Sequence, residues 1–375
     1  MPDLRAWVEI NVPAWRNNFA LICADKPKNL RFAAVIKDDA YGHGAAVGAR
    51  LAGEFGATFT AVVTVDEAIA LRTAGMNGPL LVLGQRLASE ANACVESNLT
   101  CCLQDLEIAE TISAEAGRQR KRVPVHIEVD TGMSRYGIRW TEAPDLIRRI
   151  AALPGLQFEG LMSHFAMADE MDKTFANLQA SRFQETLDAL GKIGLSPKIR
   201  HICNSGGFLD LPAAHYDMVR LGILPLGIHP SQVCRHIPGL EPVMSIKTRI
   251  VHIQNLQAGD KVGYGMRYTA SSARRIAVLP IGYGDGFPRV RNEGSVLIEG
   301  QRSPLVGGVS MDAITVDITE IPSATMWTEA VVMGRQGTDG IDVHEIAALK
   351  KSVSYDVLTN WRGRLRRVYI ETHCS

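Results

Sequence analysis

Short apolar runs recur through the first 235 residues, and most neighbouring runs are separated by a stretch with helical spacing. Eight strands alternating with helices predict an α/β fold, in which a parallel (β/α)8 barrel is favoured over a doubly wound open sheet with the same pattern. The helical stretches include 66–74 and 175–190. We predict the strands at 32–36, 58–63, 80–83, 100–103, 123–129, 157–162, 198–203 and 217–219.

The pattern changes after a stretch rich in proline and glycine at 226–240, which we interpret as a linker. Short alternating strands then follow, which is typical of a small β domain, and one helix at 343–350 interrupts them. A chain of 375 residues is also too long for one compact core. We expect a barrel domain over 10–235 and a mainly β domain over 236–375. The predicted strands of this half lie at 244–253, 274–280, 295–298, 303–306, 313–318, 330–333 and 367–370.

Composition argues against nucleic-acid and membrane partners. The 40 basic and 40 acidic side chains cancel, so no global field attracts nucleic acid or an acidic bilayer. No secretion signal and no apolar stretch of membrane-spanning length is visible, and we expect a cytoplasmic setting. Seven cysteines without C-x-x-C spacing predict reduced thiols and no metal site. Arginine-rich segments at 118–122 and 362–367 are most simply solvated, although a dimer surface could use the second.

A lysine, Lys37, follows the apolar run 32–36, and a glycine-punctuated turn leads from it into an amphipathic helix. The carboxyl ends of strands are where α/β barrels place their chemistry. Partial desolvation there lowers the pKa of an ammonium group, which gives an amine able to form a Schiff base or accept a proton. Tyr41 lies in the same turn and can direct its hydroxyl into the same mouth. A solvated lysine at a strand end is the plainer interpretation.

The segment 32–44 (FAAVIKDDAYGHG) closely resembles the lysine segment of the alanine racemases, enzymes that use pyridoxal 5′-phosphate (PLP) on a fold-type III scaffold. Further matches extend from Glu9 to near Tyr369. The resemblance implies a TIM-like barrel with a C-terminal mainly β domain, which the strand at 1–9 joins. It also implies that Lys37 binds PLP covalently.

The segment 129–137 (VDTGMSRYG) resembles the family loop whose arginine steers the substrate carboxylate and the catalytic tyrosine. By this resemblance, Arg135 is expected to have the same role. Without the resemblance, we would interpret Arg135 as a solvated turn residue. Ser134 stands in place of the usual glycine and leaves the loop conformation open. Glu128 stands where many members carry a carbamylated lysine. As an anion it could orient Arg135, or it could simply point elsewhere.

By the same resemblance, His164 lies beside the cofactor ring and Arg220 faces the pyridine nitrogen. A guanidinium keeps its proton at any working pH, so the ring nitrogen stays largely unprotonated and becomes a weaker electron sink. For Arg220 alone, a strand-end salt bridge is the plainer interpretation. The family further implies a set of residues that bind the PLP phosphate, namely Tyr41, Ser205, Gly222, Ile223 and Tyr355.

The β half supplies Tyr264 within VGYG, which matches the second catalytic base of the family. An unperturbed tyrosine, with a pKa of about 10, is a poor base, so nearby positive charge must lower its pKa. Ser310 and Met311 match a triplet in which the methionine N–H contacts the substrate carboxylate. In the family these residues reach the active site of the partner subunit, which implies a homodimer with shared active sites.

The resemblance predicts interconversion of L-alanine and D-alanine by two bases, Lys37 and Tyr264, on opposite faces of a planar carbanion. A serine or broad-specificity racemase is the nearest alternative, because Gly308 and Leu226 depart from residues that shape the substrate path in other members. A fold-type III decarboxylase fits less well with Arg220. A non-catalytic PLP carrier is a single barrel and lacks the β half.

Overall fold

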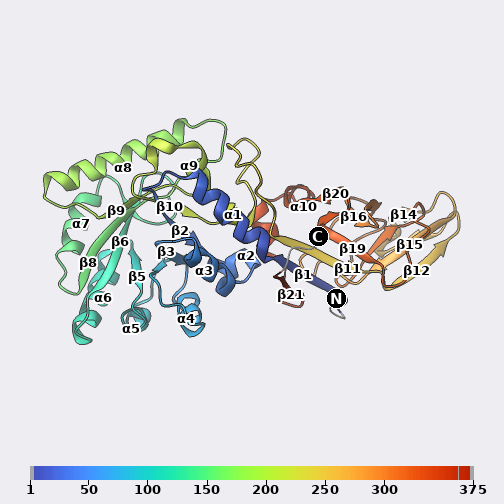
Figure 1. The fold of residues 1–375 in the computed structure, drawn as a ribbon, viewed down its shortest axis with the longest axis horizontal. Coiled ribbons are helices and arrows are strands. Elements are labelled where there is room, and N and C mark those ends of the chain that lie inside the picture. The colour runs from blue at the N-terminus through green and yellow to red at the C-terminus, as the bar shows by residue number, and fades with distance from the viewer. Residues whose placement is uncertain (1–3, 362, 372–375) are drawn as a thin grey trace. The chain divides into compact units, whose positions relative to one another are not determined.

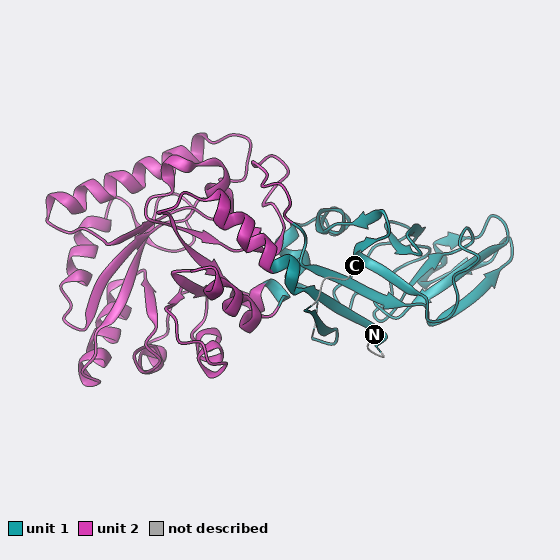
Figure 2. Cartoon of the chain, in the orientation of Figure 1, with its two compact units in different colours: residues 1–15, 41–43, 241–375 teal, residues 16–40, 44–240 magenta. Residues whose placement is uncertain are grey.

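The computed structural model describes residues 4–361 and 363–371 of the chain (Figure 1). Its Cα positions separate into two compact units (Figure 2). The first comprises residues 1–15, 41–43 and 241–375, and the second comprises residues 16–40 and 44–240. The chain therefore passes between units twice near Tyr41.

In the described residues of the second unit, eight parallel strands form a nearly closed barrel in the order β10-β2-β3-β4-β5-β6-β8-β9. Between β9 and β10 the backbone N–H of Arg220 donates to the carbonyl of Cys203 at 2.9 Å. The barrel confirms the predicted fold class. Its strands are β2 (Arg31–Val35), β3 (Phe59–Val62), β4 (Leu80–Val82), β5 (Thr100–Leu103), β6 (Val123–Asp130), β8 (Leu156–Met162), β9 (Ile199–His201) and β10 (Met218–Leu221), and β7 (Ile138–Arg139) pairs with β6.

Helices cover the outside of the barrel, as Figure 1 shows. Several begin at side chains that accept a hydrogen bond from the first helical turn, such as Thr64 for α4 and Asp105 for α6. The helices are α1 (Val12–Asp25), α2 (Lys37–Gly42), α3 (Ala45–Glu54), α4 (Val65–Thr73), α5 (Ala91–Glu96), α6 (Leu106–Arg118), α7 (Ala143–Ala151), α8 (Thr174–Lys192) and α9 (Ser205–Asp210). Short 3₁₀ turns are η1 (Ala88–Glu90), η2 (Pro212–Ala214) and η3 (Leu224–Leu226).

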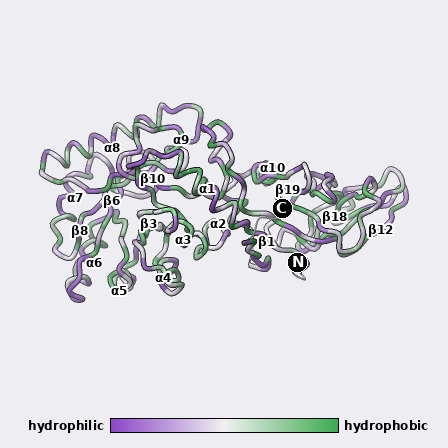
Figure 3. Tube along the Cα trace, in the orientation of Figure 1, coloured by the Kyte–Doolittle hydropathy of each residue, from purple (hydrophilic) through white to green (hydrophobic). Residues whose placement is uncertain are grey.

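Apolar strand residues fill the barrel core, and hydrophobic segments recur along the barrel strands (Figure 3). One cluster joins Ala33, Phe59, Ala61, Leu81, Ile199 and Met218. Burial on both faces explains why these strands have near-continuous apolar sequences rather than alternating ones. Polar residues are nevertheless buried among them, notably His126 and His201, which are both 0% exposed.

The first unit is mainly β. Strand β1 (Ala6–Asn11) pairs antiparallel with β11 (Met244–Arg249) and parallel with β21 (Arg366–Ile370), so the N-terminal strand joins this unit. The other strands are β12 (His252–Leu256), β13 (Lys261–Val262), β14 (Tyr268–Thr269), β15 (Arg274–Leu279), β16 (Ser295–Ile298), β17 (Gln301–Pro304), β18 (Ile314–Asp317), β19 (Glu329–Gln336) and β20 (Asp339–Ile341). Helices α10 (Val343–Lys350) and α11 (Ser354–Thr359) and the 3₁₀ turn η4 (Tyr264–Met266) complete it.

The first unit differs from the sequence expectations in the bounds of its strands and in the surroundings of its arginines. The strand expected at 244–253 is divided into β11 and β12. The arginines near the C-terminus are not simply solvated, because Arg364 forms ion pairs with Asp285 and Asp312, and Arg367 donates to backbone carbonyls. All of these acceptors lie in the same unit, and of the two carboxylates Asp285 is buried and Asp312 is exposed. Arg362 and Cys374 lie outside the described residues.

The other cysteines are free thiols in the described part of the chain, and most are buried. Among the described residues, no helix combines the length and the apolar character that crossing a bilayer demands.

Candidate functional site

Lys37 lies at the carboxyl end of β2 and is the first residue of α2. Burial lowers the pKa of its ammonium group, and the positive charge of Arg135 lowers it further. Glu67 acts in the opposite direction, and its carboxylate accepts the backbone N–H of Asp38 at 2.6 Å. The amine of Lys37 is therefore easier to deprotonate than a solvated lysine.

The turn after Lys37 is wound in the left-handed sense. Residues 38–41 have φ angles of 51–54°, and Gly42 follows at 81°. For L-residues this conformation costs about 1–2 kcal/mol per residue, so surrounding contacts must hold it. The Asp39 side chain accepts the N–H of Ala45 at 2.7 Å, and its carbonyl accepts the N–H of Gly44 at 2.8 Å. The predicted glycine-punctuated turn is thus a strained helical turn made mainly of non-glycine residues.

Tyr41 and Tyr355, two of the residues predicted to bind phosphate, lie together in the first unit. Their ring centroids are 6.1 Å apart and the rings are inclined by 59°. The carbonyl of Gly42, next to Tyr41, accepts a hydrogen bond from Arg367 Nε at 3.2 Å. The carboxyl end of the left-handed turn is therefore tied to the C-terminal part of the chain.

Arg220 on β10 is 3% exposed, and in the described structure its hydrogen-bond partners are all uncharged. Its Nη1 donates to His201 Nδ1 at 2.8 Å, and its Nη2 donates to His164 Nδ1 at 2.9 Å. The remaining acceptors are the carbonyls of Ser163, Ile202 and His201. Burial lowers the pKa of Arg220, but a guanidinium retains its proton under all working conditions. The predicted alternative of a strand-end salt bridge is wrong.

The buried charge of Arg220 acts on the imidazole groups around it. Burial lowers the pKa of His164 and of His201 well below the ordinary value, and the guanidinium lowers both further. Both imidazoles are consequently neutral at neutral pH. The charge of Lys37 also contributes to the shift at His164, which places these two predicted site residues in one electrostatic environment.

The predicted phosphate-binding residues of the barrel follow β9 and β10. The backbone N–H of Gly222 donates to Ser205 Oγ at 3.3 Å, so these two positions lie side by side. Ile223 is 1% exposed. The Asn204 side chain accepts the N–H of Gly207 at 3.0 Å and holds the start of α9 in place. The structure thus brings small residues and backbone amides together at neighbouring strand ends.

Arg135 is exposed in the loop after β6. Ser134 adopts a φ of 55°, a conformation usual for glycine, and its N–H donates to Asp130 Oδ1 at 3.0 Å. The loop therefore keeps a glycine-type geometry despite the serine. The Glu128 carboxylate, which is 5% exposed, accepts a hydrogen bond from Gln104 at 2.8 Å and has no ion pair with Arg135. Burial raises the pKa of Glu128.

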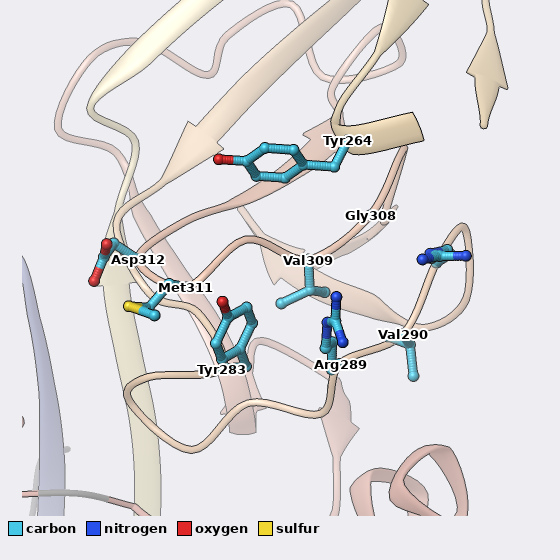
Figure 4. A pocket seen from close by; sticks show the side chains of 9 residues that line it. Tyr264, Tyr283, Arg289, Val290, Gly308, Val309, Met311 and Asp312 are labelled. Atoms are coloured by element: carbon cyan, nitrogen blue, oxygen red, sulfur yellow. The ribbon is translucent and has the colours of Figure 1, made fainter. Parts of the chain in front are cut away.

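The first unit has a pocket of about 420 Å³, with Tyr264, Tyr283, Met311 and Asp312 among its lining residues. Figure 4 shows the two phenol rings on opposite sides of this pocket, with both hydroxyls directed toward the side of Met311 and Asp312. Tyr264 is 78% exposed and Met311 is 52% exposed. Two glycines with positive φ, Gly263 and Gly265, flank Tyr264 and allow the tight turn that projects its side chain.

An ionic network supports the wall of this pocket. The Asp285 side chain is fully buried, and it pairs with Arg364 at 2.9 Å and with Arg5 at 3.2 Å. It also accepts the backbone N–H of Gly282 at 2.9 Å. The next residue, Tyr283, donates its N–H to the Ser310 carbonyl at 3.1 Å. The buried Asp285 carboxylate, paired with two half-exposed arginines, thus fixes the loop of Tyr283, and a backbone hydrogen bond joins this loop to the one that carries Ser310.

Arg291 lies against Gly308 in the same pocket. A Cβ atom added at Gly308 would lie 3.6 Å from Arg291 Cγ, and the two residues form an isolated β-bridge. The space that a side chain at position 308 would occupy is therefore bordered by Arg291. The sequence revealed the gap at Gly308 but not this neighbour.

The barrel also contains polar residues to which the sequence analysis gave no role. His201 contacts Arg220 directly, and His126 contacts His201 with 2.8 Å between Nδ1 and Nε2. Glu159 lies 3.4 Å from the other nitrogen of His126. The sequence did contain a signal for these residues. His126 and His201 lie within apolar strands, and a buried polar side chain requires a hydrogen-bond partner.

A barrel with a low-pKa lysine at its mouth, followed by a mainly β unit, is the architecture of a class of amino-acid racemases. The alanine racemase N-terminal domain family matches residues 10–230, and the alanine racemase C-terminal domain family matches residues 243–369. The chain therefore belongs to the alanine racemase family.

Individual relatives agree with this assignment. The chain is 40% identical to the alanine racemase of Syntrophobacter fumaroxidans over 353 residues, 94% of each protein. The solved alanine racemase of Clostridium difficile 630 superposes with a TM-score of 0.94 at 32% identity, covering 99% of this chain and 97% of the other. A histidine racemase from Leuconostoc mesenteroides gives a TM-score of 0.88 at 28% identity, covering 99% of both chains.

Proposed function

We propose that this chain is a PLP-dependent racemase that interconverts L-alanine and D-alanine, with Lys37 and Tyr264 as its two bases. The observation that carries the proposal is the presence at the barrel mouth of a lysine of lowered pKa and of a buried guanidinium, Arg220, whose hydrogen-bond partners are all uncharged in the described structure. The close relation to alanine racemases supports alanine as the substrate.

The residues at the barrel mouth fit PLP by their chemistry. The amine of Lys37 suits the aldehyde, and a guanidinium that only donates suits an unprotonated ring nitrogen. Gly222, Ser205 and Ile223 at the ends of neighbouring strands would hold the phosphate, with Tyr41 and Tyr355. PLP bound here would supply the electron withdrawal that acidifies the α-carbon of the amino acid.

The protein groups then move the proton. Lys37 Nζ would remove or return it on the side of the D-enantiomer, and the Tyr264 hydroxyl would do so on the other face. Arg135 would orient the substrate carboxylate, and the Met311 N–H would donate to it. The neutral Nδ1 of His164 accepts from Arg220, so its Nε2–H is a donor available to the site.

We further propose that the active site is shared between two copies of the chain. Tyr264 and Met311 are strongly exposed, and Tyr283 is 37% exposed, although aromatic and thioether side chains are normally buried. A second copy that covers this pocket would bury these side chains and supply its own Lys37 to the pocket.

A mixing experiment tests the shared site. Lys37→Ala and Tyr264→Phe should each lose alanine racemisation in deuterated water. In a mixed population, only dimers with one chain of each kind keep one intact site, so mixing should restore about a quarter of the activity. Two inactive variants that stay inactive on mixing would show that both bases come from one chain.

A different amino acid is the second candidate substrate. The chain superposes on a protein named histidine racemase, and this likeness is the reason for considering a larger amino acid. Chiral chromatography of an amino-acid panel ranks the candidates. Alanine should exchange fastest, and faster exchange of serine or histidine would contradict the assignment.

A further inference from the structure

A chain of hydrogen bonds extends from Arg220 through the barrel interior. Arg220 Nη1 lies 2.8 Å from His201 Nδ1, and His201 Nε2 lies 2.8 Å from His126 Nδ1. His126 Nε2 lies 3.4 Å from Glu159 Oε2. His201 ends β9 and Arg220 lies within β10, whereas Glu159 is in the middle of β8. This series of hydrogen bonds thus leads away from the barrel mouth to the Glu159 carboxylate, whose side chain is 23% exposed.

The chemistry of the two ends fixes the direction of every bond. A guanidinium can only donate, so the Nδ1 of His201 must accept and its proton must be on Nε2. That N–H donates to Nδ1 of His126, which places the second proton on Nε2 of His126. This last N–H requires an acceptor, and the Glu159 carboxylate is one. Reversing the order would direct an N–H of His201 at the guanidinium.

The protonation states of the members agree with this order. Burial lowers the pKa of His126 and of His201, so both imidazoles stay neutral and have one N–H each. The hydrogen bond from His126 lowers the pKa of Glu159, and the positive charges of Lys198 and Arg31 lower it further. Glu159 is therefore an ionised terminal acceptor.

A local irregularity of the sheet directs Glu159 toward the histidine. Along the pairing of β6 with β8, Val125 is opposite Phe158 and His126 is opposite Gly160, so Glu159 is an extra residue in its strand. Such bulges redirect a side chain and are common beside active sites. The next residue has no side chain for a packing reason, because a Cβ atom at Gly160 would lie 2.7 Å from the imidazole of His126. The bulge and Gly160 together accommodate the His126–Glu159 contact.

We propose that Glu159 is a positioning residue for Arg220, because it fixes the tautomers of His126 and His201 that allow the guanidinium to donate to His201 and His164 together. Its role in catalysis rests on the proposed racemase function, since Arg220 is expected to contact the cofactor ring. The tautomer order itself does not depend on that function.

The first test is the nitrogen NMR spectrum of histidines labelled with ¹⁵N in the full-length holoenzyme. Protonated and unprotonated ring nitrogens differ clearly in shift, and each should be assigned by histidine replacement. The unmodified protein should show N–H at Nε2 and an unprotonated Nδ1 at both His126 and His201. A proton on Nδ1 of His201 would overturn the proposal without any variant.

The second test compares three variants on the same strand. Glu159→Leu removes the acceptor and should introduce a second tautomer at both histidines, with kcat for alanine racemisation reduced about tenfold and KM unchanged. Glu159→Gln keeps an acceptor oxygen and should retain the original tautomers and nearly the original kcat. Gln157→Leu, two residues away on β8, is the control and should change neither quantity.

Unchanged spectra or an unchanged kcat in Glu159→Leu would refute the positioning role. If Glu159→Leu does not fold, Glu159→Gln and the unmodified protein still test the donor order. If the unmodified protein does not racemise alanine, the racemase proposal fails while the tautomer order is still decided by the spectra.

Discussion

Acidification should destabilise the barrel through its buried imidazoles. The pKa of His164 and that of His201 lie well below the ordinary value of 6.5 in the folded protein. In the unfolded chain both take up protons near pH 6.5, so the unfolded state binds more protons as the pH falls. Stability from these groups is complete above pH 6.5 and is lost below it.

The size of the loss follows from the linkage relation. A group with an unfolded pKa of 6.5 that stays neutral when folded loses about 1.3 kcal/mol between about pH 7 and pH 5.5. The two histidines together should reduce the free energy of unfolding by about 2.5 kcal/mol. His126 acts in the same direction. Glu128 offsets part of the loss, because burial raises its pKa and the folded state gains a proton there.

Urea unfolding at the two pH values, at one ionic strength and followed by the helical circular dichroism signal, measures this loss. The barrel has most of the helices, so this signal reports on the unit of interest. His201→Asn should reduce the pH dependence by about 1.3 kcal/mol. Replacing His252, which is exposed on β12, should leave it unchanged. Equal or greater stability at the lower pH would refute the assignment of neutral buried imidazoles.

Two further predictions concern stability. Gly42→Ala should destabilise the protein by about 2–3 kcal/mol, because the new Cβ atom combines a positive φ with a 3.0 Å approach to the Leu358 carbonyl. Gly56→Ala has a similar φ but no neighbour within 4 Å, so a thermal melt should show a smaller loss, and equal losses would contradict the clamp at Gly42. Asp285→Asn should cost about 2 kcal/mol, because it removes the charge of a buried carboxylate that accepts hydrogen bonds from the half-exposed Arg5 and Arg364. The matched change at the half-exposed Asp339, which pairs with Arg302, should lower the melting temperature less, and a comparable drop there would count against burial of Asp285 as the cause.

Much of the fold could be predicted from apolar patterning. The barrel strands coincide with the apolar runs of the sequence. Helix α10 (Val343–Lys350) has both of its predicted ends, and the side chain of Asp342 caps its first turn. The short strands β13 and β14 could not be predicted, because two residues carry no periodicity. Helix α11 was also missed.

The site was predictable only in part, for physical reasons. Lys37 follows β2 and Arg220 lies near the carboxyl end of β10, where the apolar pattern and the chemistry of the side chains both indicate a site. The left-handed turn could not be foreseen, because Asp38 and Ala40 are L-residues that disfavour positive φ. Glu159 was missed because a bulge is a property of strand pairing, and the sequence of one strand does not show it.

The clamp on Gly42 constrains how this enzyme can be divided. Residues 41–43 cluster with the C-terminal part of the chain, where Arg367 holds the carbonyl of Gly42. A truncated product that ends at Leu240 would include Lys37 but lack Arg367, which anchors the left-handed turn after this lysine. A chimaera that takes its two halves from different enzymes would combine the turn after Lys37 from one parent with the arginine that binds this turn from the other. Chimaeras should therefore take residues 41–43 and the C-terminal strand from the same parent.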